Sequence, residues 1–306
     1  MSAQTISRAP GQGRMFGIWL HSFFIIICLG AFIIPFLYVI SVSLTNEDAL
    51  VRYGYQLIPS EFDFTAYLYV FSNPRALVDA YGVTIFQSVL GTVLGLILMA
   101  MAAYTLSRPA YFLRKQLAFL IFFTMIFNGG LIPTFILNTQ YLHLGNSIWI
   151  YIVSPWLVQA FYIIILRSFF QELPPALAES AKVDGASETR IFLQIILPLS
   201  KPVLATIALL TLMERWNVWY TTLIYINNSR LYTLQYLLQK ILLDAQAIQN
   251  MIENVPPGQE KLLNSLVPNE SLRYAMCVLA AGPMLFVFMF FQKYFAKGMT
   301  VGSVKG

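Results

Sequence analysis

Residues that could carry out chemistry are few in this chain of 306 residues, and they do not cluster. The two histidines, His21 and His143, are isolated and look interfacial. A membrane enzyme would need a grouped set of histidine, aspartate or serine residues, which the sequence does not contain. The two cysteines, Cys28 and Cys277, fall inside apolar stretches and are interpreted as small apolar filler. We therefore predict no catalytic site, no metal site and no disulfide.

One charged pair, Glu214-Arg215, falls near the middle of a long apolar run. A charge at the centre of a bilayer costs about 2.5–3.5 kcal/mol even on the lowest scales, so we expect both side chains to avoid lipid. Their neighbours add amides and aromatic rings of the kind that suit sugar faces. Both a transport path and a structural contact remain open as interpretations. The candidate path residues are Glu214, Arg215, Trp216, Asn217, Tyr220 and Asn128.

Two glycine patterns lie inside apolar runs, Asn128-Gly129-Gly130 and Gly91-x3-Gly95. A glycine pair can interrupt a helix beside a transport path. It can also let two helices approach closely. Close packing is the interpretation that we favour for both patterns.

The elements that must position these residues are apolar runs. The chain is 58% hydrophobic and only 11% charged, against roughly 25% charged in a soluble domain. Runs that can cross about 30 Å of hydrocarbon indicate membrane helices, and the absence of two-residue alternation argues against a barrel. We predict an all-α membrane protein with six spans, at residues 16–43, 81–107, 117–137, 148–166, 202–226 and 274–292.

Charges in the connecting segments predict the orientation of these spans. Lys and Arg concentrate in cytoplasmic loops. Twelve of them fall in residues 1–15, 108–116, 167–201 and 293–306, against six in residues 44–80, 138–147 and 227–273. Both termini are therefore predicted to be cytoplasmic. The domains are a segment 1–15, a six-span domain 16–293 with an external loop 227–273, and a tail 294–306.

The cytoplasmic loop 167–201 contains two short predicted helices. Pro174-Pro175 can open the first helix, since a proline at the first position loses no needed donor. Gly185 can supply the turn that follows, because glycine tolerates a positive φ. Ser187 can cap the second helix, which we expect to end at Leu197-Pro198. Such a half-apolar knob suits a groove on a soluble partner.

The loop resembles the EAA loop of the permease subunits of type I ABC importers, in the carbohydrate branch. The matching motif is Glu179-x-Ala181-x3-Gly185 followed by Ile196-x-Pro198, with Ser180 where the family has alanine. Trp216-Asn217 with Leu223-Ile224 is similar to sugar permeases. The ending 297–306 is similar to permeases for fragments of complex polysaccharides, such as aldouronates, pectic fragments or alginate. The resemblance implies an ATPase-docking set of Glu179, Ser180, Ala181, Asp184, Gly185, Ala186, Phe192 and Pro198.

The resemblance also implies partners: a second permease that is a different chain, two ATPase subunits, and an external substrate-binding protein. A phosphate-binding Gly-x4-Gly-Lys-Ser/Thr motif is absent from the sequence. We therefore expect this chain to bind no cofactor, with ATP and Mg on the ATPase, in the inner membrane of a bacterium. The alternatives are an ion-coupled secondary transporter and a permease for a non-sugar solute. The scattered basic residues argue against a nucleic-acid partner.

Overall fold

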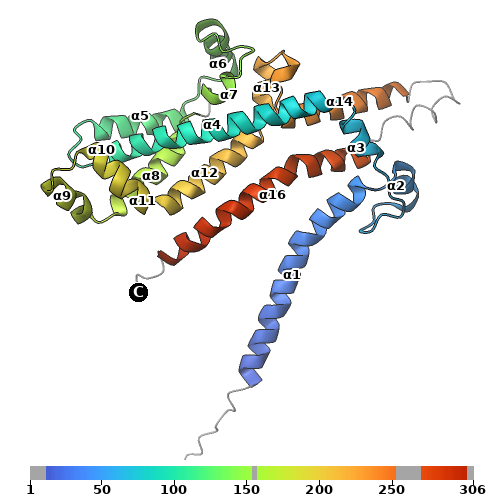
Figure 1. Ribbon diagram of the computed structural model, residues 1–306, viewed down its shortest axis with the longest axis horizontal. Coiled ribbons are helices and arrows are strands. Elements are labelled where there is room, and N and C mark those ends of the chain that lie inside the picture. The colour runs from blue at the N-terminus through green and yellow to red at the C-terminus, as the bar shows by residue number, and fades with distance from the viewer. Residues whose placement is uncertain (1–11, 154–156, 253–269, 302–306) are drawn as a thin grey trace, which may run out of the picture. The chain divides into compact units, whose positions relative to one another are not determined.

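The computed structural model describes residues 12–153, 157–252 and 270–301, and this part of the chain is all-helical, with a single isolated β-bridge. Its helices, shown in Figure 1, are α1 Gln12–Ser43, α2 Glu47–Tyr53, α3 Thr65–Val70, α4 Pro74–Ser107, α5 Arg114–Ile126, α6 Leu131–Ile136, the π-helix η1 Leu137–Tyr141, α7 Ile150–Val153, α8 Ala160–Glu172, α9 Pro175–Val183, α10 Glu188–Ile191, the π-helix η2 Phe192–Ile196, α11 Leu197–Leu199, α12 Lys201–Trp216, α13 Tyr220–Tyr225, the 3-10 helix η3 Ser229–Leu231, α14 Leu234–Ile252 and α16 Glu270–Val301.

The chain forms two compact units, one of residues 1–69 with 245–278 and one of residues 70–244 with 279–306. In the first unit, Asn46 caps α2 by accepting a hydrogen bond from the amide of Asp48 at 2.9 Å. The Glu47 carboxylate accepts the amides of Glu270 and Ser271, at 3.1 and 3.2 Å. A negative charge at these free amides stabilises the start of α16.

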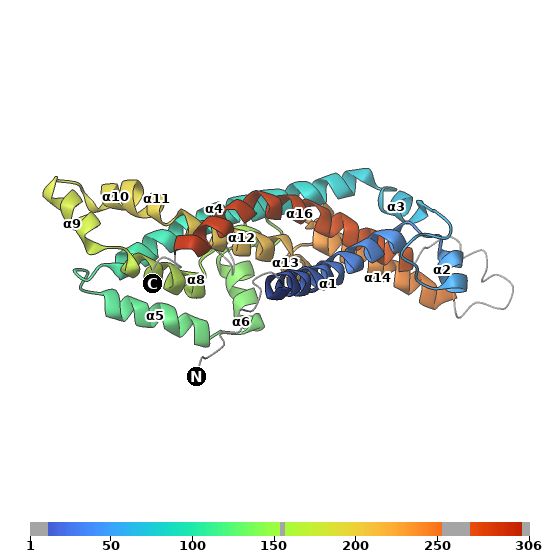
Figure 2. The ribbon, with the colours of Figure 1, turned by 90° about the horizontal axis from the view of Figure 1, so that it is seen from below.

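The second unit is built on α4, which packs against α8 and α12. The core at one end of α4 contains Ala103 and Leu166, both fully buried, and it extends to Ile191 at the end of α10. A separate apolar cluster at the other end of α4 contains Ile150 and Tyr151. Figure 2 shows α9 to α11 at the end where α4 stops and α5 begins. The loop helices are therefore anchored in the core of this unit.

Three predicted spans are confirmed as single long helices. Within the described residues, His21–Ser43, Pro74–Ser107 and Glu270–Gln292 are long and apolar enough to cross a membrane. The side chains of the first are almost all exposed, as Phe24 and Ile26 illustrate. This helix has the length and the apolar composition of a membrane span.

The predicted spans 117–137 and 202–226 are not single helices. In the first, α5 is followed by α6 and η1 at an angle of 111°. Gly130, with φ +84°, precedes α6 and donates its amide to the Asn128 side chain at 2.9 Å. The glycine pair therefore breaks the helix, and our preference for close packing at this position was wrong. In the second, α12 ends at Trp216 and α13 begins at Tyr220.

The predicted span 148–166 is also not a single helix. The structure has the four-residue α7 and then the 13-residue α8, and residues 154–156 between them lie outside the described part. At 1.5 Å per residue, α8 alone reaches about 20 Å, which is short of the hydrocarbon thickness. Counting each bent pair as one span, the described residues have up to five spans.

The segment 227–273, which we predicted to be an external loop, contains a helix that was not predicted from the sequence, α14. Leu234 and Leu238 on its first turns are buried, and the amide of Leu234 donates to Thr84 on α4 at 2.8 Å. The Lys240 ammonium lies over the Tyr232 ring, 5.4 Å from its centroid. An amphipathic pattern over 234–252 was the available signal. The rest of the predicted loop, 253–269, lies outside the described residues.

Close packing is confirmed at the second glycine pattern, Gly91-x3-Gly95 on α4. A Cβ at Gly91 would overlap the guanidinium of Arg215, and a Cβ at Gly95 would lie 2.5 Å from the carbonyl oxygen of Leu157. These contacts require hydrogen in place of a side chain, because a carbon at such distances overlaps its neighbour.

Substitution of Gly91 by alanine is expected to destabilise the protein by about 1–3 kcal/mol, because the new methyl group must displace Arg215. Heating followed by size-exclusion chromatography in detergent measures the loss. Gly82→Ala is the matched control, because Gly82 lies on the same helix. Among the described residues, no atom lies within 4 Å of its added carbon apart from its chain neighbours and the nearby backbone of α4 itself. Equal melting temperatures for the two variants would contradict the predicted overlap.

Candidate functional site

The first candidate site is the loop of α9, α10, η2 and α11. Pro175 opens α9, as predicted. Ser187 caps α10, accepting the amide of Arg190 at 3.3 Å, also as predicted. The predicted break at Leu197-Pro198 is wrong, because the chain continues as η2 and α11 to Leu199, with Pro198 in the first turn of α11. The bend of 80° follows between α11 and α12.

The turn that ends α9 has the hydrogen bonds of a Schellman motif. Gly185 has a φ of +78°, as expected from the sequence. Its amide donates to the carbonyl of Lys182 at 3.0 Å, and the amide of Ala186 donates to the carbonyl of Ala181 at 2.9 Å. This pattern satisfies the last carbonyls of the helix and requires the left-handed conformation at the glycine.

Glu188 fastens the loop to α4. Its carboxylate forms an ion pair with Lys182 and accepts a hydrogen bond from the hydroxyl of Tyr104, both at 2.5 Å. The Lys182 ammonium, and then the Tyr104 hydroxyl, hold the pKa of the Glu188 carboxyl below its usual range. The Glu188 carboxylate is therefore ionised at neutral pH, and its contribution to stability is lost only as the pH falls through this lowered pKa. Neither Tyr104 nor Glu188 was among the functional residues predicted from the sequence.

The predicted docking residues fall into an inner and an outer group. Ala181 and Ala186 are half-buried, and Phe192 is buried, with its ring centroid 5.0 Å from that of Tyr104. The outer group consists of Glu179, Ser180, Asp184, Gly185 and Pro198, all exposed. Val183, also on the outer side, is 88% exposed. The loop thus exposes a surface of polar side chains and Val183, while its inner residues are packed against α4.

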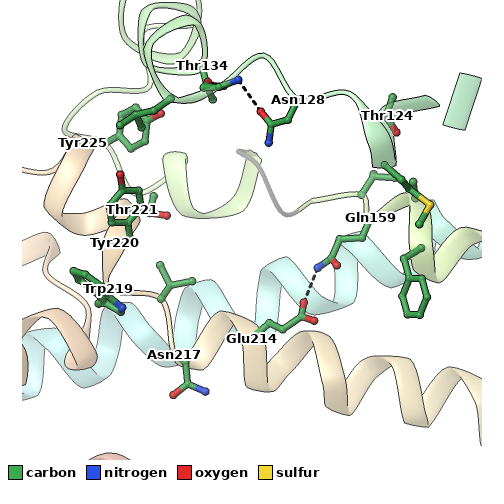
Figure 3. Close-up of a pocket in the computed structure, with 17 residues that line it drawn as sticks. Thr124, Asn128, Thr134, Gln159, Glu214, Asn217, Trp219, Tyr220, Thr221 and Tyr225 are labelled. Carbon is green, nitrogen blue, oxygen red and sulfur yellow. Dashed lines mark hydrogen bonds between the residues drawn. The ribbon is translucent and has the colours of Figure 1, made fainter. Parts of the chain in front are cut away.

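The second candidate site is a cavity of about 920 Å³ in the second unit. Its walls come from the break between α5 and α6, the start of α8, and the break between α12 and α13, as Figure 3 shows. Four of the six predicted path residues line it: Asn128, Glu214, Asn217 and Tyr220. The other lining residues are Thr124, Met125, Gly130, Leu131, Thr134, Val158, Gln159, Ala160, Phe161, Val218, Trp219, Thr221 and Tyr225.

Glu214 is the one charged side chain among the described residues that line this cavity. One carboxylate oxygen accepts the side-chain amide of Gln159 at 2.7 Å, and the other accepts the hydroxyl of Tyr162 at 2.7 Å. Figure 3 shows the first of these bonds on the cavity wall. Tyr162 lies on α8 and Gln159 directly precedes it. Neither residue was predicted from the sequence. For Gln159 the available signal was a single glutamine within an apolar run. Charge-assisted bonds of this kind fix the orientation of the carboxylate.

Arg215 and Trp216 do not line the cavity. Arg215 is only 2% exposed, and its guanidinium donates to the carbonyl oxygen of Tyr151 at 3.0 Å. The side-chain amide of Gln87 donates to the backbone carbonyl of Arg215 at 2.6 Å. The indole of Trp216 donates to the carbonyl of Ala280 on α16 at 3.0 Å. Consecutive helical residues point about 100° apart. Glu214 therefore faces the cavity, whereas Arg215 is buried between helices.

The second unit combines a helix of membrane-spanning length, a polar cavity and an anchored loop of short helices, an arrangement that suits a transport protein. Residues 81–301 match the family described as binding-protein-dependent transport system inner membrane component. Since this match covers most of the chain, the chain belongs to that family, and it is an inner-membrane permease subunit.

Individual relatives are similar over nearly the whole length. The polygalacturonan/rhamnogalacturonan transport system permease protein YtcP of Bacillus subtilis is 37% identical, over 96% of this chain and 100% of that protein. The protein LplC of the same organism is 39% identical over 90% of each chain. A crystal structure of a bacterial ABC transporter involved in the import of the acidic polysaccharide alginate has a chain with a TM-score of 0.75 and 31% identity, covering 94% of this chain and 99% of that one.

Proposed function

We propose that this chain forms, together with a second and different permease subunit, the path by which an oligosaccharide enters the cell. An external binding protein would deliver the substrate, and two ATPase subunits would supply the energy. The observation that carries the proposal is the loop around Gly185, a rigid knob with exposed Val183 and Glu179 at its outer side. An apolar side chain that is left in water on an otherwise anchored helix suits a partner groove.

We propose six spans with both termini in the cytoplasm. The loop charges support this orientation, with twelve basic residues on the cytoplasmic side against six outside. The sixth crossing would combine α7 and α8, which are too short to cross separately. The α9–α11 loop would then lie in the cytoplasm, where an ATPase can reach it.

An oligosaccharide fits the chemistry of the cavity wall. Asn128, Gln159 and Asn217 supply amides that can both donate and accept hydrogen bonds. Trp219 and Tyr220, whose rings lie 5.7 Å apart at a steep angle, supply aromatic faces. Relatives are named for polygalacturonan, arabinooligosaccharide and maltodextrin transport, which supports a sugar substrate for this chain.

The proposal is tested by copurification and uptake. A tagged chain expressed with its genomic neighbours should bring down an ATPase and a second permease. Proteoliposomes of the complex, supplied with the binding protein, should accumulate oligosaccharide with ATP and not with an ion gradient alone. Uptake driven by an ion gradient in the absence of ATP would instead support a secondary transporter.

Replacement of Glu214 by alanine is expected to lower ATP-dependent uptake by about tenfold, because a charge-assisted contact in the path is worth roughly 1.5 kcal/mol. Folded yield should hold, since the side chain is exposed. Glu214→Gln is the matched variant, because it keeps an acceptor for the Tyr162 hydroxyl while removing the charge. Wild-type uptake and yield in Glu214→Ala would remove Glu214 from the path and from the structural framework alike.

A further inference from the structure

A second cavity, of about 460 Å³, lies beside the α9 loop and has a basic lining. It is enclosed by the end of α4, the start of α5, the end of α8 and one side of α9. Its lining includes Arg108, Arg114 and Lys182 but only one acidic residue, Glu179. Lys182 is paired with Glu188. The two arginines therefore leave the cavity electropositive, and it differs in both place and charge from the cavity that contains Glu214.

The guanidinium of Arg108 has an unused donor. It lies over the Tyr104 ring, 4.3 Å from the centroid. Its Nε is buried and has no hydrogen-bond partner in the part of the chain that the structure describes, and the same holds for the Nε of Arg167. Because these two Nε atoms have almost no accessible surface, an acceptor from outside the chain would have to bind the terminal nitrogens of the guanidinium groups. Arginine donors match the oxygens of a phosphate group.

An apolar groove of about 340 Å³ is lined by residues of α4, α5 and α8, three of the four helices that enclose the basic cavity. It is lined by Leu106, Ala118, Phe119, Ile121, Phe122, Ile163, Ile164 and Arg167. On α4 the groove begins at Leu106, the residue just before Ser107 of the basic cavity. On α5 the groove residue Ala118 is one turn after the cavity residue Arg114. The groove and the cavity are therefore neighbours, with Arg167 among the apolar side chains.

We propose that this composite site binds an anionic phospholipid of the cytoplasmic leaflet. The headgroup phosphate would accept from Arg108 and Arg167, with Arg114 nearby, and an acyl chain would lie in the groove beside Phe119, which is 68% exposed. A basic pocket between membrane helices on the cytoplasmic side is a recognised arrangement for acidic headgroups. The assignment of the leaflet rests on the proposed orientation, whereas the site itself rests on its lining alone.

The occupant would also touch the loop, because Ala178, Glu179 and Lys182 of α9 line the basic cavity. An acidic side chain of a docked partner protein would satisfy the arginines but would leave the apolar groove empty. A free phosphate has the same limitation. The adjoining groove therefore favours an amphiphile over either of these ligands.

The test is lipid retention by the purified complex, measured by native mass spectrometry after delipidation and titration. Phosphatidylglycerol, phosphatidylcholine and glycerol phosphate are compared as probes. Arg114→Gln should lower phosphatidylglycerol retention about fivefold. The neighbouring Lys115→Gln removes the same charge from an exposed residue outside the lining, and it should leave retention within twofold of wild type.

Three outcomes would overturn the proposal. Equal losses in Arg114→Gln and Lys115→Gln would indicate general surface charge. Retention of phosphatidylcholine equal to that of phosphatidylglycerol would show that the site does not select for the headgroup charge. Glycerol phosphate that binds as tightly as the lipid would identify a free-phosphate site. Size-exclusion profiles confirm that each variant is folded. The readout is lipid retention alone, so a failure here is distinguished from a failure of the importer proposal, which copurification and uptake test separately.

Discussion

Valine in place of Gly185 is expected to abolish ATPase copurification and ATP-dependent uptake together, each by about tenfold or more, while membrane insertion stays normal. The φ of +78° costs a β-branched residue about 1–2 kcal/mol. Relaxing that strain breaks the Schellman bonds from the amides of Gly185 and Ala186 and moves Val183 and Glu179. The membrane helices keep their own backbone bonds and do not depend on this turn. Pull-down of the ATPase and proteoliposome uptake measure the two losses.

The cause would be the backbone conformation rather than crowding within the chain. Among the described residues, no atom beyond the chain neighbours lies within 4 Å of a carbon added at Gly185. Gly185→Asn is the matched control, because asparagine tolerates the left-handed region, and it should retain most of the docking. Glu179→Lys should weaken docking with unchanged membrane yield. Wild-type docking and uptake in Gly185→Val would make the loop an ordinary connector.

The second large effect is expected at Arg215. Its replacement by alanine should lower the stability of the fold by about 2–4 kcal/mol. The substitution removes a side chain that is 2% exposed and leaves the carbonyl oxygen of Tyr151 without this donor. It also empties the space that Gly91 keeps open on α4. Thermal unfolding in detergent, followed by size-exclusion chromatography, measures the loss.

The neighbouring residue provides the control for this prediction. Glu214→Gln lies one position away but on the exposed wall of the cavity, and it should unfold at the wild-type temperature. When Gly91→Ala is combined with Arg215→Ala, the destabilisation caused by Gly91→Ala should largely disappear. The reason is that the guanidinium which the new methyl group would overlap is no longer present. A normal unfolding temperature for Arg215→Ala would show that the buried guanidinium is not structural.

The features that the sequence predicted correctly depend on residues close together along the chain. The helix α9, the positive φ of Gly185 and the cap at Ser187 each involve bonds that reach at most a few residues. The long helices α1, α4 and α16 follow from apolar length alone, because a bilayer requires every backbone group to be bonded within the helix. The family resemblance rested on these same local residues.

Only the tertiary structure decided where the remaining apolar runs break and which way their charges point. As consecutive residues of a helix, Glu214 and Arg215 must point in different directions, but the sequence could not tell which of the two would be buried. That depends on Gly91 and Tyr151, which are distant in sequence and leave room and an acceptor for the guanidinium. Burial of Arg215 depends on these long-range contacts, and the residues next to it in the sequence do not reveal them.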